Sequence, residues 1–428
     1  MARFATELDH AALPAILRYM ASIVGWSAWR QRAESLKGEL SGSPYWEEYL
    51  RERHGLELAF SDAHKHLRTT GRIRWPPQTD DEYRLYSFLA GAVGIHSHLS
   101  ADGQARFKGA LRNGLDSEFG LGPLSFEVKT AVHLVSRGFD VEFHDLEDGG
   151  GYDFLAVSGA NRIEVECKHL SADVGRQIHR REFHALGGVL KPVIERALQE
   201  SREGLFVRVT LPGRLSGNKV EQQAITSRIS TVLRGEIDVV DDHICAAKLQ
   251  SFVLENSPFK QDYSKEIAME DIQRFLLEDF GIENRNVFLH WHPGRAAILV
   301  SIESKGPDRV LRRIFKSLKD DAKKQFSGRF PAVLCLHLAD LTEAELLELA
   351  DVDQTGTPTG LARMASALLQ SRPHLFSVAI MTDGNVQLSR HRHRGGTRTS
   401  MQEKGPCYLF HNPDHAAAGN QALEQIFE

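Results

Sequence analysis

The clearest alternation of hydrophobic and polar positions occurs in two short runs on either side of a polar turn. Residues 152–157 and 162–168 have strand-like compositions, and residues 158–161 between them are polar and include a glycine. Runs of this kind around a short turn are typical of an antiparallel β-hairpin. The simplest register of this hairpin pairs Val157 with Arg162.

This register predicts which side chains face one another across the hairpin. It places Leu155 opposite Glu164 and Asp153 opposite Glu166, so that the last two carboxylates lie about 5 Å apart. Because side chains alternate along a strand, Lys168 lies on the same face as Glu166. The opposite face of the second strand carries Ile163, Val165 and Cys167.

Two carboxylates that face each other need a nearby positive charge, because like charges in cross-strand pairs are destabilising. A divalent cation would supply it. Mg²⁺ is typically held by one or two carboxylates together with waters and substrate phosphate, so Asp153 and Glu166 would suffice, with the backbone carbonyl of Cys167 as a further ligand. We expect Lys168 to orient or deprotonate the attacking water and to offset charge in the transition state.

A helix upstream of the hairpin adds a third acid. Residues 124–137 place apolar side chains at helical spacing, and Gly138 follows as a stop signal. On the helical wheel Glu127 falls among the apolar positions. Since a carboxylate that points inward needs a partner, Glu127 is predicted to join the site on the sheet that this helix covers.

The alternative is an ordinary amphipathic hairpin with solvent-facing charges. Leu155 and Val157 argue against it, because they share the face of Asp153 and Glu166. A face of this mixed character fits a half-covered cleft better than a solvated surface.

The order of the predicted helices and strands resembles that of a known family. The helix with Glu127 is followed by strand-like segments at 139–144, 153–157 and 162–168, a long helix predicted over 173–201, and a strand at 205–211. This α-β-β-β-α-β order, with an acid on the second strand and Glu-x-Lys on the third, resembles the PD-(D/E)XK nuclease superfamily, or restriction-endonuclease-like fold. The resemblance covers residues 120–212, less than a quarter of the chain.

The resemblance implies roles for individual residues. It makes Asp153 and Glu166 the metal ligands, Lys168 the catalytic lysine, Glu127 the helix acid and Gln177 the polar residue of the following helix. The proline that names the motif is absent, because Tyr152 precedes Asp153. Arg181 stands where RecB-like members carry a tyrosine, so no subfamily is assigned.

The amino-acid composition limits the class of protein to which the chain can belong. The 428 residues are 42% hydrophobic and 25% charged, which is ordinary for a soluble globular protein of two to four domains. No segment has the length and apolar character of a membrane span, so a cytoplasmic protein without membrane association is expected. The four cysteines occur singly, which does not favour zinc sites or disulfides.

The formal net charge of −5 means that phosphate contacts must come from local basic patches. One patch directly follows the predicted site, and a basic helix over 308–326 is a second. Both have an ordinary solvated helix face as the alternative. The residues of the first patch predicted to bind nucleic acid are Arg176, His179, Arg180 and Arg181.

The sequence therefore predicts an α/β protein with three regions. Residues 1–120 are expected to be mainly helical, 121–212 to form the restriction-endonuclease-like αβββαβ core, and 213–428 to form a mixed α/β region.

The expected activity is hydrolysis of phosphodiester bonds, acting on DNA, with Mg²⁺ as cofactor and Mn²⁺ able to replace it. Restriction-like or antiphage defence is the suggested role, by family analogy alone. An RNA substrate stays open, as do a non-cleaving nucleic-acid-binding module and a core gated by a protein partner through the flanking regions. A homodimer is one expectation, because cutting both strands often takes two sites.

Overall fold

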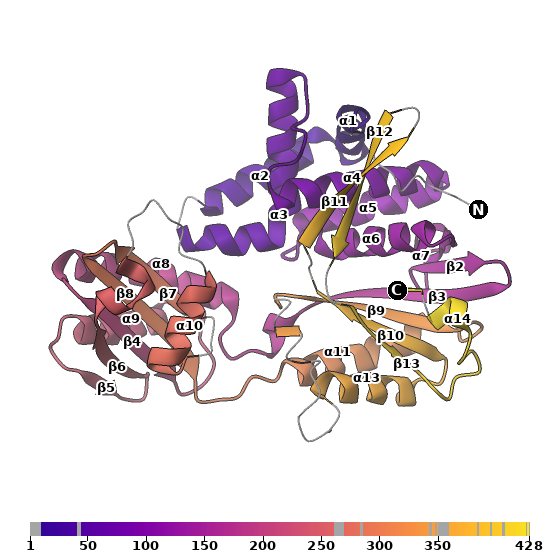
Figure 1. The fold of residues 1–428 in the computed structure, drawn as a ribbon. Helices are drawn as coiled ribbons and strands as arrows, with labels where there is room; N and C mark the ends of the chain where they lie inside the picture. The colour runs from indigo at the N-terminus through magenta and orange to yellow at the C-terminus, as the bar shows by residue number, and fades with distance from the viewer. Residues whose placement is uncertain are drawn as a thin grey trace. The chain divides into compact units, whose positions relative to one another are not determined.

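The computed structural model describes residues 10–40, 44–260, 269–282, 286–341, 345–346, 349, 359–382, 385–393, 396–404, 407–424 and 426–427. The chain forms two compact units (Figure 1). Unit 1 comprises Met1–Glu39, Leu50–Ala172 and Leu311–Glu428, and unit 2 comprises Leu40–Tyr49 and Asp173–Val310.

The N-terminal part of the chain is helical, as its sequence predicts. In α1, the buried side chains Leu13, Leu17, Met20 and Val24 recur at helical spacing and form one apolar stripe. The start of α4 is capped by Thr79, whose hydroxyl accepts a hydrogen bond from the amide of Glu82. The helices of this part are α1 (Leu13–Val24), α2 (Trp26–Leu40), α3 (Pro44–Thr70), α4 (Asp80–His98), α5 (Ala101–Asp116) and α6 (Gly122–Ser136).

Unit 1 is built on a six-stranded mixed sheet with the order β1-β2-β3-β9-β10-β13. The first three strands are antiparallel, β3, β9 and β10 are parallel, and β13 is antiparallel to β10. The strands are β1 (Asp140–Phe143), β2 (Phe154–Ser158), β3 (Asn161–Ser171), β9 (Ala332–Ala339), β10 (Leu375–Met381) and β13 (Cys407–His411).

The two faces of this sheet are covered by different helices. Ile163, Val165 and Cys167 of β3 belong to one continuous hydrophobic core with buried residues of α1, α4, α5 and α6. Figure 1 shows α11 (Val310–Gln325) and α13 (Gly360–Ser371) on the opposite face. The N-terminal helices are therefore one layer of unit 1 and share its core.

The strand predicted at 205–211 forms, but it does not belong to the sheet that contains β3, although the sequence placed both in one core. It is β4 (Gly204–Leu211), and it lies in the five-stranded sheet of unit 2, whose order is β5-β6-β4-β8-β7. The parallel neighbour of β3 is instead β9, with Cys167 opposite Cys335. Every residue of β9 except the last is buried, which suits a strand covered on both faces.

Unit 2 buries hydrophobic side chains on both faces of its sheet. One core joins α8 and α9 to strand residues such as Val207 and Val300, and a second joins α10 to Phe206 and Leu299. The elements of unit 2 are η1 (Ala172–Gly175), α8 (Arg180–Glu200), β4, α9 (Lys219–Leu233), β5 (Val239–Asp241), β6 (Ala246–Phe252), η2 (Leu254–Asn256), η3 (Pro258–Lys260), α10 (Met269–Phe280), β7 (Val287–His292) and β8 (Ala296–Ser304).

The two ends of the 173–310 segment lie next to each other. The amide of Arg309 donates to the carbonyl of Gly175 at 2.7 Å. A side chain at Gly175 would collide with the backbone of Val310, so glycine permits this close approach. The larger part of unit 2, Asp173–Val310, is thus inserted between β3 and α11, and its smaller part, Leu40–Tyr49, interrupts unit 1 a second time. The compact units do not follow the three consecutive regions expected from the sequence.

The remaining described elements of unit 1 are small. They are α7 (His144–Asp148), the two-stranded β11 (Asn385–His393) and β12 (Gly396–Lys404), and α14 (Gln421–Glu424). The basic helix predicted over 308–326 is α11, and the side chains of Lys319, Lys323 and Lys324 lie outside the described residues. No helix in the described ranges is long and apolar enough to cross a membrane.

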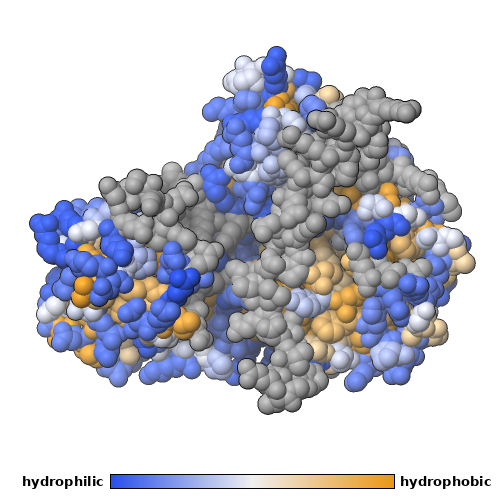
Figure 2. Space-filling view, in the orientation of Figure 1, coloured by the Kyte–Doolittle hydropathy of each residue, from blue (hydrophilic) through white to orange (hydrophobic). Residues whose placement is uncertain are grey.

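The face drawn in Figure 2 mixes hydrophilic and hydrophobic residues on both units. Large hydrophobic side chains that are exposed, such as Val220 and Val253, are scattered along unit 2. The mixed α/β fold predicted from the sequence is confirmed.

Candidate active site

The β2–β3 hairpin has the predicted register. Val157 pairs with Arg162 and Leu155 pairs with Glu164. The ladder ends at Phe154 opposite Val165, so Asp153 stands one residue before the first pair.

Two residues form the turn of this hairpin. Gly159 adopts a positive φ of 59°, which a glycine reaches without steric cost. Ser158 and Asn161, on either side of the turn, form the last pair of the ladder. A glycine at this point therefore sets the register that brings Asp153 next to β3.

Asp153 is joined directly to β3. Its Oδ2 accepts a hydrogen bond from the backbone amide of Cys167 at 2.6 Å. This bond lies next to Glu166, as the predicted pairing requires. Burial raises the pKa of Asp153 well above its usual range, and the carboxylates of Glu127 and Glu166 raise it further.

Glu166 and Lys168 form an ion pair on the same face of β3. The Lys168 Nζ lies 2.7 Å from Glu166 Oε1, and the Glu166 residue is only 1% exposed. The second carboxylate oxygen, Oε2, is buried and has no hydrogen-bond partner. Burial raises the pKa of Glu166, while Lys168 lowers it. An unpartnered buried carboxylate oxygen is costly, and a bound cation would remove that cost.

Glu127 lies on α6 and takes part in the same electrostatic cluster. Burial raises its pKa to about 8, with further contributions from Asp145 and Glu166, and Lys168 acts in the opposite direction. By surface exposure the Glu127 residue is half-buried. Its contact with a cation stays a prediction.

Asp145 is a fourth acid of this cluster, and sequence reasoning missed it. It lies in the first turn of α7, between β1 and β2, where the sequence favoured a continuing strand to residue 144. Burial raises its pKa to about 6. The segment also contains Glu147 and Asp148, so composition alone does not single out one acid.

Toward the turn of the hairpin, the side chains make contacts that stabilise the fold and do not belong to the proposed site. Glu164 is fully buried and accepts hydrogen bonds from the amide and the hydroxyl of Ser327. Tyr152, Leu155 and Val157 form a small hydrophobic cluster there, against Phe326 and Phe330. These contacts cover the face on which Leu155 and Val157 were predicted to share space with the acids.

The residues present fit a hard divalent cation. All the side-chain donors are carboxylate oxygens, which Mg²⁺ prefers, and Glu166 Oε2 has no other partner. Asp153 and Glu166 would hold the ion. Within the described ranges, no group of three or more His, Cys, Asp or Glu side chains is placed to hold a metal ion.

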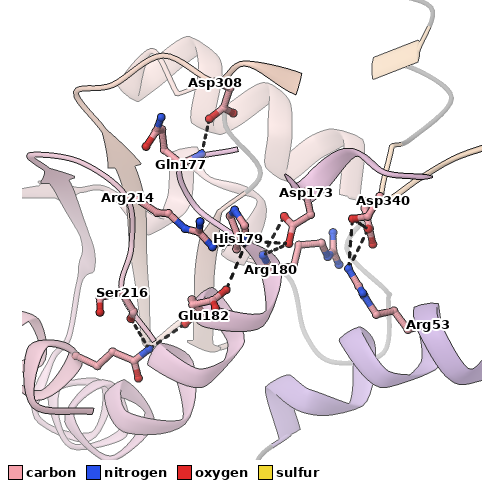
Figure 3. Close-up of polar contacts among 12 residues, drawn as sticks. Arg53, Asp173, Gln177, His179, Arg180, Glu182, Arg214, Ser216, Asp308 and Asp340 are labelled. Atoms are coloured by element: carbon pink, nitrogen blue, oxygen red, sulfur yellow. Dashed lines mark hydrogen bonds and ion pairs between the residues drawn. The ribbon is translucent and has the colours of Figure 1, made fainter. Parts of the chain in front are cut away.

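Gln177 does not lie on a helix, contrary to the prediction. It stands in unit 2 between η1 and α8, where its amide donates to Asp308 at 2.7 Å and its side chain donates to the carbonyl of Pro307 at 3.3 Å (Figure 3). The predicted helix over 173–201 begins only at Arg180. The reason is that the Asp173 carboxylate accepts hydrogen bonds from the Arg180 amide and stabilises the helix start there.

The predicted nucleic-acid-binding residues also belong to unit 2. His179 is the residue immediately before α8, and its Nδ1 lies 3.0 Å from a guanidinium nitrogen of Arg214 (Figure 3). Arg180 and Arg181 are the first two residues of that helix, and Arg176 precedes it. Their contact with phosphates stays a prediction.

Comparisons with known proteins do not identify the chain: no family model matches it, and neither does any curated protein or solved structure.

Proposed function

We propose that this protein is a Mg²⁺-dependent nuclease whose active site is formed by Glu127, Asp153, Glu166 and Lys168 of unit 1. The observation that carries the proposal is the buried ion pair of Glu166 and Lys168 on β3, beside which Asp153 is fixed by the hydrogen bond from the Cys167 amide. The carboxylates of Glu127 and Glu166 raise the pKa of Asp153, and that of Glu166 raises the pKa of Glu127. Acids with raised pKa values, one of them buried beside a cationic side chain, are typical of catalytic sites.

The proposed core is restriction-endonuclease-like, with a changed connection. The first four elements are α6, β1, β2 and β3, as expected. The final helix and strand are α11 and β9, because β9 is parallel and adjacent to β3. The helix α8 and the strand β4, which the sequence assigned to this core, belong to unit 2 instead.

Each residue has a distinct role in this proposal. Asp153 and Glu166 hold the cation, with the Cys167 carbonyl as a further ligand. When bound, the cation supplies Lewis-acid stabilisation of charge on the phosphate. Lys168 orients or deprotonates the attacking water, and Glu127 supports the site from α6. Gln177 keeps no catalytic role here, since its side chain is bound to the backbone of its own unit.

DNA is the substrate we propose, in restriction-like or antiphage defence. The defence role rests on analogy with the fold family alone. Arg176, His179, Arg180 and Arg181 are the proposed phosphate contacts. Two copies acting together would cut both strands, and manganese would replace magnesium.

The test is cleavage of labelled linear, circular and single-stranded DNA and of RNA, with Mg²⁺ or Mn²⁺ and with a chelator. Wild type is compared with Lys168→Ala, Asp153→Asn and Glu166→Gln. We expect metal-dependent cleavage of DNA that each variant lowers by at least about 100-fold, the usual scale for loss of one electrostatic or acid-base group.

Matched controls are Lys65→Ala and Glu142→Gln, which change an exposed lysine and an exposed acid of the same unit. Both should cleave like wild type. If wild type binds DNA but neither cleaves it nor binds Mn²⁺, the nuclease is refuted and a non-cleaving nucleic-acid-binding module replaces it. Cleavage that appears only with a protein partner would favour a gated core.

A further inference from the structure

A strongly charged surface that the proposed site does not use is the outer face of α11. Residues 308–326 contain seven lysines and arginines and three aspartates, in a chain whose formal net charge is −5. No acidic residue stands in the first turn of the helix. Arg312, Arg313 and Lys316 belong to unit 1, and all three are exposed.

These three residues lie together on one face of α11. Lys316 follows Arg312 by four residues and Arg313 by three, which are the spacings of neighbours on a helix surface. Ile314 and Leu318 are buried and mark the opposite face. Arg312, Arg313 and Lys316 therefore form a basic stripe along the outer side of the helix.

The charges of the basic stripe are not neutralised by described side chains. No ion pair joins any of the three residues to another side chain that the structure describes. Exposed cations on other helices of unit 1 do have such partners, as in the pairs Arg30–Glu34 and Lys37–Asp62. Like charges three and four residues apart on a helix repel each other, so a polyanion bound along the stripe would remove an unfavourable interaction.

The helix α11 runs back along β3 toward the start of that strand. The residue before the helix donates to the carbonyl of Gly175, which follows the end of β3 by four residues. Beyond the other end of the helix, Ser327 donates to Glu164 of β3 from its amide, at 2.9 Å, and from its hydroxyl. With rises of about 1.5 Å per helical residue and about 3.3 Å per strand residue, Lys316 and Lys168 each lie about 13 Å from this end. The basic stripe is therefore roughly level with the proposed site.

We propose that the basic stripe of α11 binds the phosphate backbone of duplex DNA. The proposal deepens the proposed function and rests on it for the choice of DNA. It adds a surface on unit 1 to the phosphate contacts proposed for unit 2.

Charge complementarity identifies the partner. The nucleic-acid backbone carries a dense row of negative charges, and lysine and arginine side chains neutralise them one by one. A duplex is favoured over a single strand, because single strands are bound through bases stacked on aromatic side chains. Among the described residues of α11, no aromatic side chain is exposed.

The competing explanation is an ordinary solvated helix face, which predicts that DNA affinity does not depend on these residues. The experiment measures binding of a labelled DNA duplex to the full chain by fluorescence anisotropy, over a series of salt concentrations. A chelator is present, so that metal-dependent cleavage does not interfere. The stripe variant combines Arg312→Gln, Arg313→Gln and Lys316→Gln.

Two further variants are matched to the stripe variant. Arg312→Lys combined with Arg313→Lys keeps every charge of the stripe. Lys65→Gln, Arg68→Gln and Arg112→Gln combined remove the same number of exposed positive charges from other helices of unit 1.

We expect the stripe variant to bind the duplex about tenfold more weakly or worse. The slope of log K against log salt should become smaller by about three, because each phosphate contact contributes about one. Both matched variants should keep the wild-type slope. The thermal midpoint of the stripe variant without DNA should equal or exceed that of wild type, since the repulsion between like charges is gone.

Wild-type affinity and salt slope in the stripe variant would overturn the proposal in favour of a solvated face, and cleavage by the same protein with Mg²⁺ would leave the nuclease intact. Binding that depends on the stripe in a protein that cleaves no nucleic acid would support the surface and refute only the nuclease. A stripe that matters for RNA and not for duplex DNA would overturn the choice of partner. Wild type that binds no duplex even at low salt would overturn the proposal outright.

Discussion

At the scale of single residues, the main property of the site is the free energy that is needed to ionise several carboxyl groups which lie close together and away from water. Glu127, Asp145, Asp153 and Glu166 all have raised pKa values, and burial is the largest cause for each. Lys168 is the only lysine among the causes of these shifts. A raised pKa means that ionisation of the group costs free energy in the folded state.

This cost predicts how stability depends on pH. The Glu127 carboxyl titrates at about 8 in the folded protein and near its ordinary value of 4.5 when unfolded. Between these two pH values the folded state binds more protons than the unfolded state does. The free energy of unfolding therefore falls as the pH rises from about 4.5 to about 8. We expect the thermal midpoint of chelator-treated protein to be lower at pH 8 than at pH 6.

The Glu127→Gln variant should show a smaller difference between the two pH values, because glutamine cannot ionise. Glu142→Gln is the control, since Glu142 is exposed on β1. Mn²⁺ should reduce the difference in wild type as well. A midpoint that is constant or rises from pH 6 to pH 8 in chelator would contradict the burial of these acids.

At the scale of elements, the place of Glu127 depends on how closely α6 packs against α4. Gly91 of α4 faces Val128 and Val132 of α6. A Cβ atom at Gly91 would lie 2.7 Å from Val128 Cγ1 and 2.8 Å from Val132 Cγ2. These distances are shorter than carbon atoms tolerate, so glycine sets the separation of the two helices.

Gly91→Ala should therefore destabilise the protein by about 1–3 kcal/mol, the usual cost of overpacking a core. Denaturant-induced unfolding measures this change. The matched control is Gly109→Ala on α5, where a Cβ would meet nothing within 4 Å. There we expect a gain of about 0.5–1 kcal/mol from helix propensity. Equal stabilisation by both substitutions would show that the two helices separate freely.

At the scale of the whole molecule, unit 1 is interrupted by the two parts of unit 2, of which Asp173–Val310 is by far the larger. The cores of unit 2 consist entirely of residues between Ile178 and Ile302. Its entry and exit are joined by the hydrogen bond between Arg309 and Gly175. A segment with its own cores and adjacent ends has the features of an independently folding domain.

We therefore expect residues 173–310, expressed alone, to unfold cooperatively on heating. Residues 173–212, which correspond to the end of the core expected from the sequence, should not, because β4 would lose its neighbours β6 and β8. Circular dichroism and amide hydrogen exchange measure both fragments. A 173–310 fragment without protected amides would contradict this division of the chain.

The sequence by itself determined the local part of the site. The register of the β2–β3 hairpin, the position of α6 and the inward carboxylate of Glu127 depend on interactions within about 45 residues, from Gly122 to Lys168. Turn chemistry and periodicity act over such distances, so they can be read directly from the residues.

Only the tertiary structure decided which strand lies beside β3. Both β4 and β9 follow a helix and have strand composition, and local patterns do not state how far along the chain a partner lies. The apolar run of β9 favours a central parallel strand, whereas β4 contains Arg208 and Thr210. The position of Asp145 was likewise decided by the tertiary structure, through the two hydrogen bonds from α7 to the carbonyl of Asp153. Strand pairing across a long insertion and the position of a connecting turn both depend on the packing of the whole unit, so local sequence patterns do not reveal them.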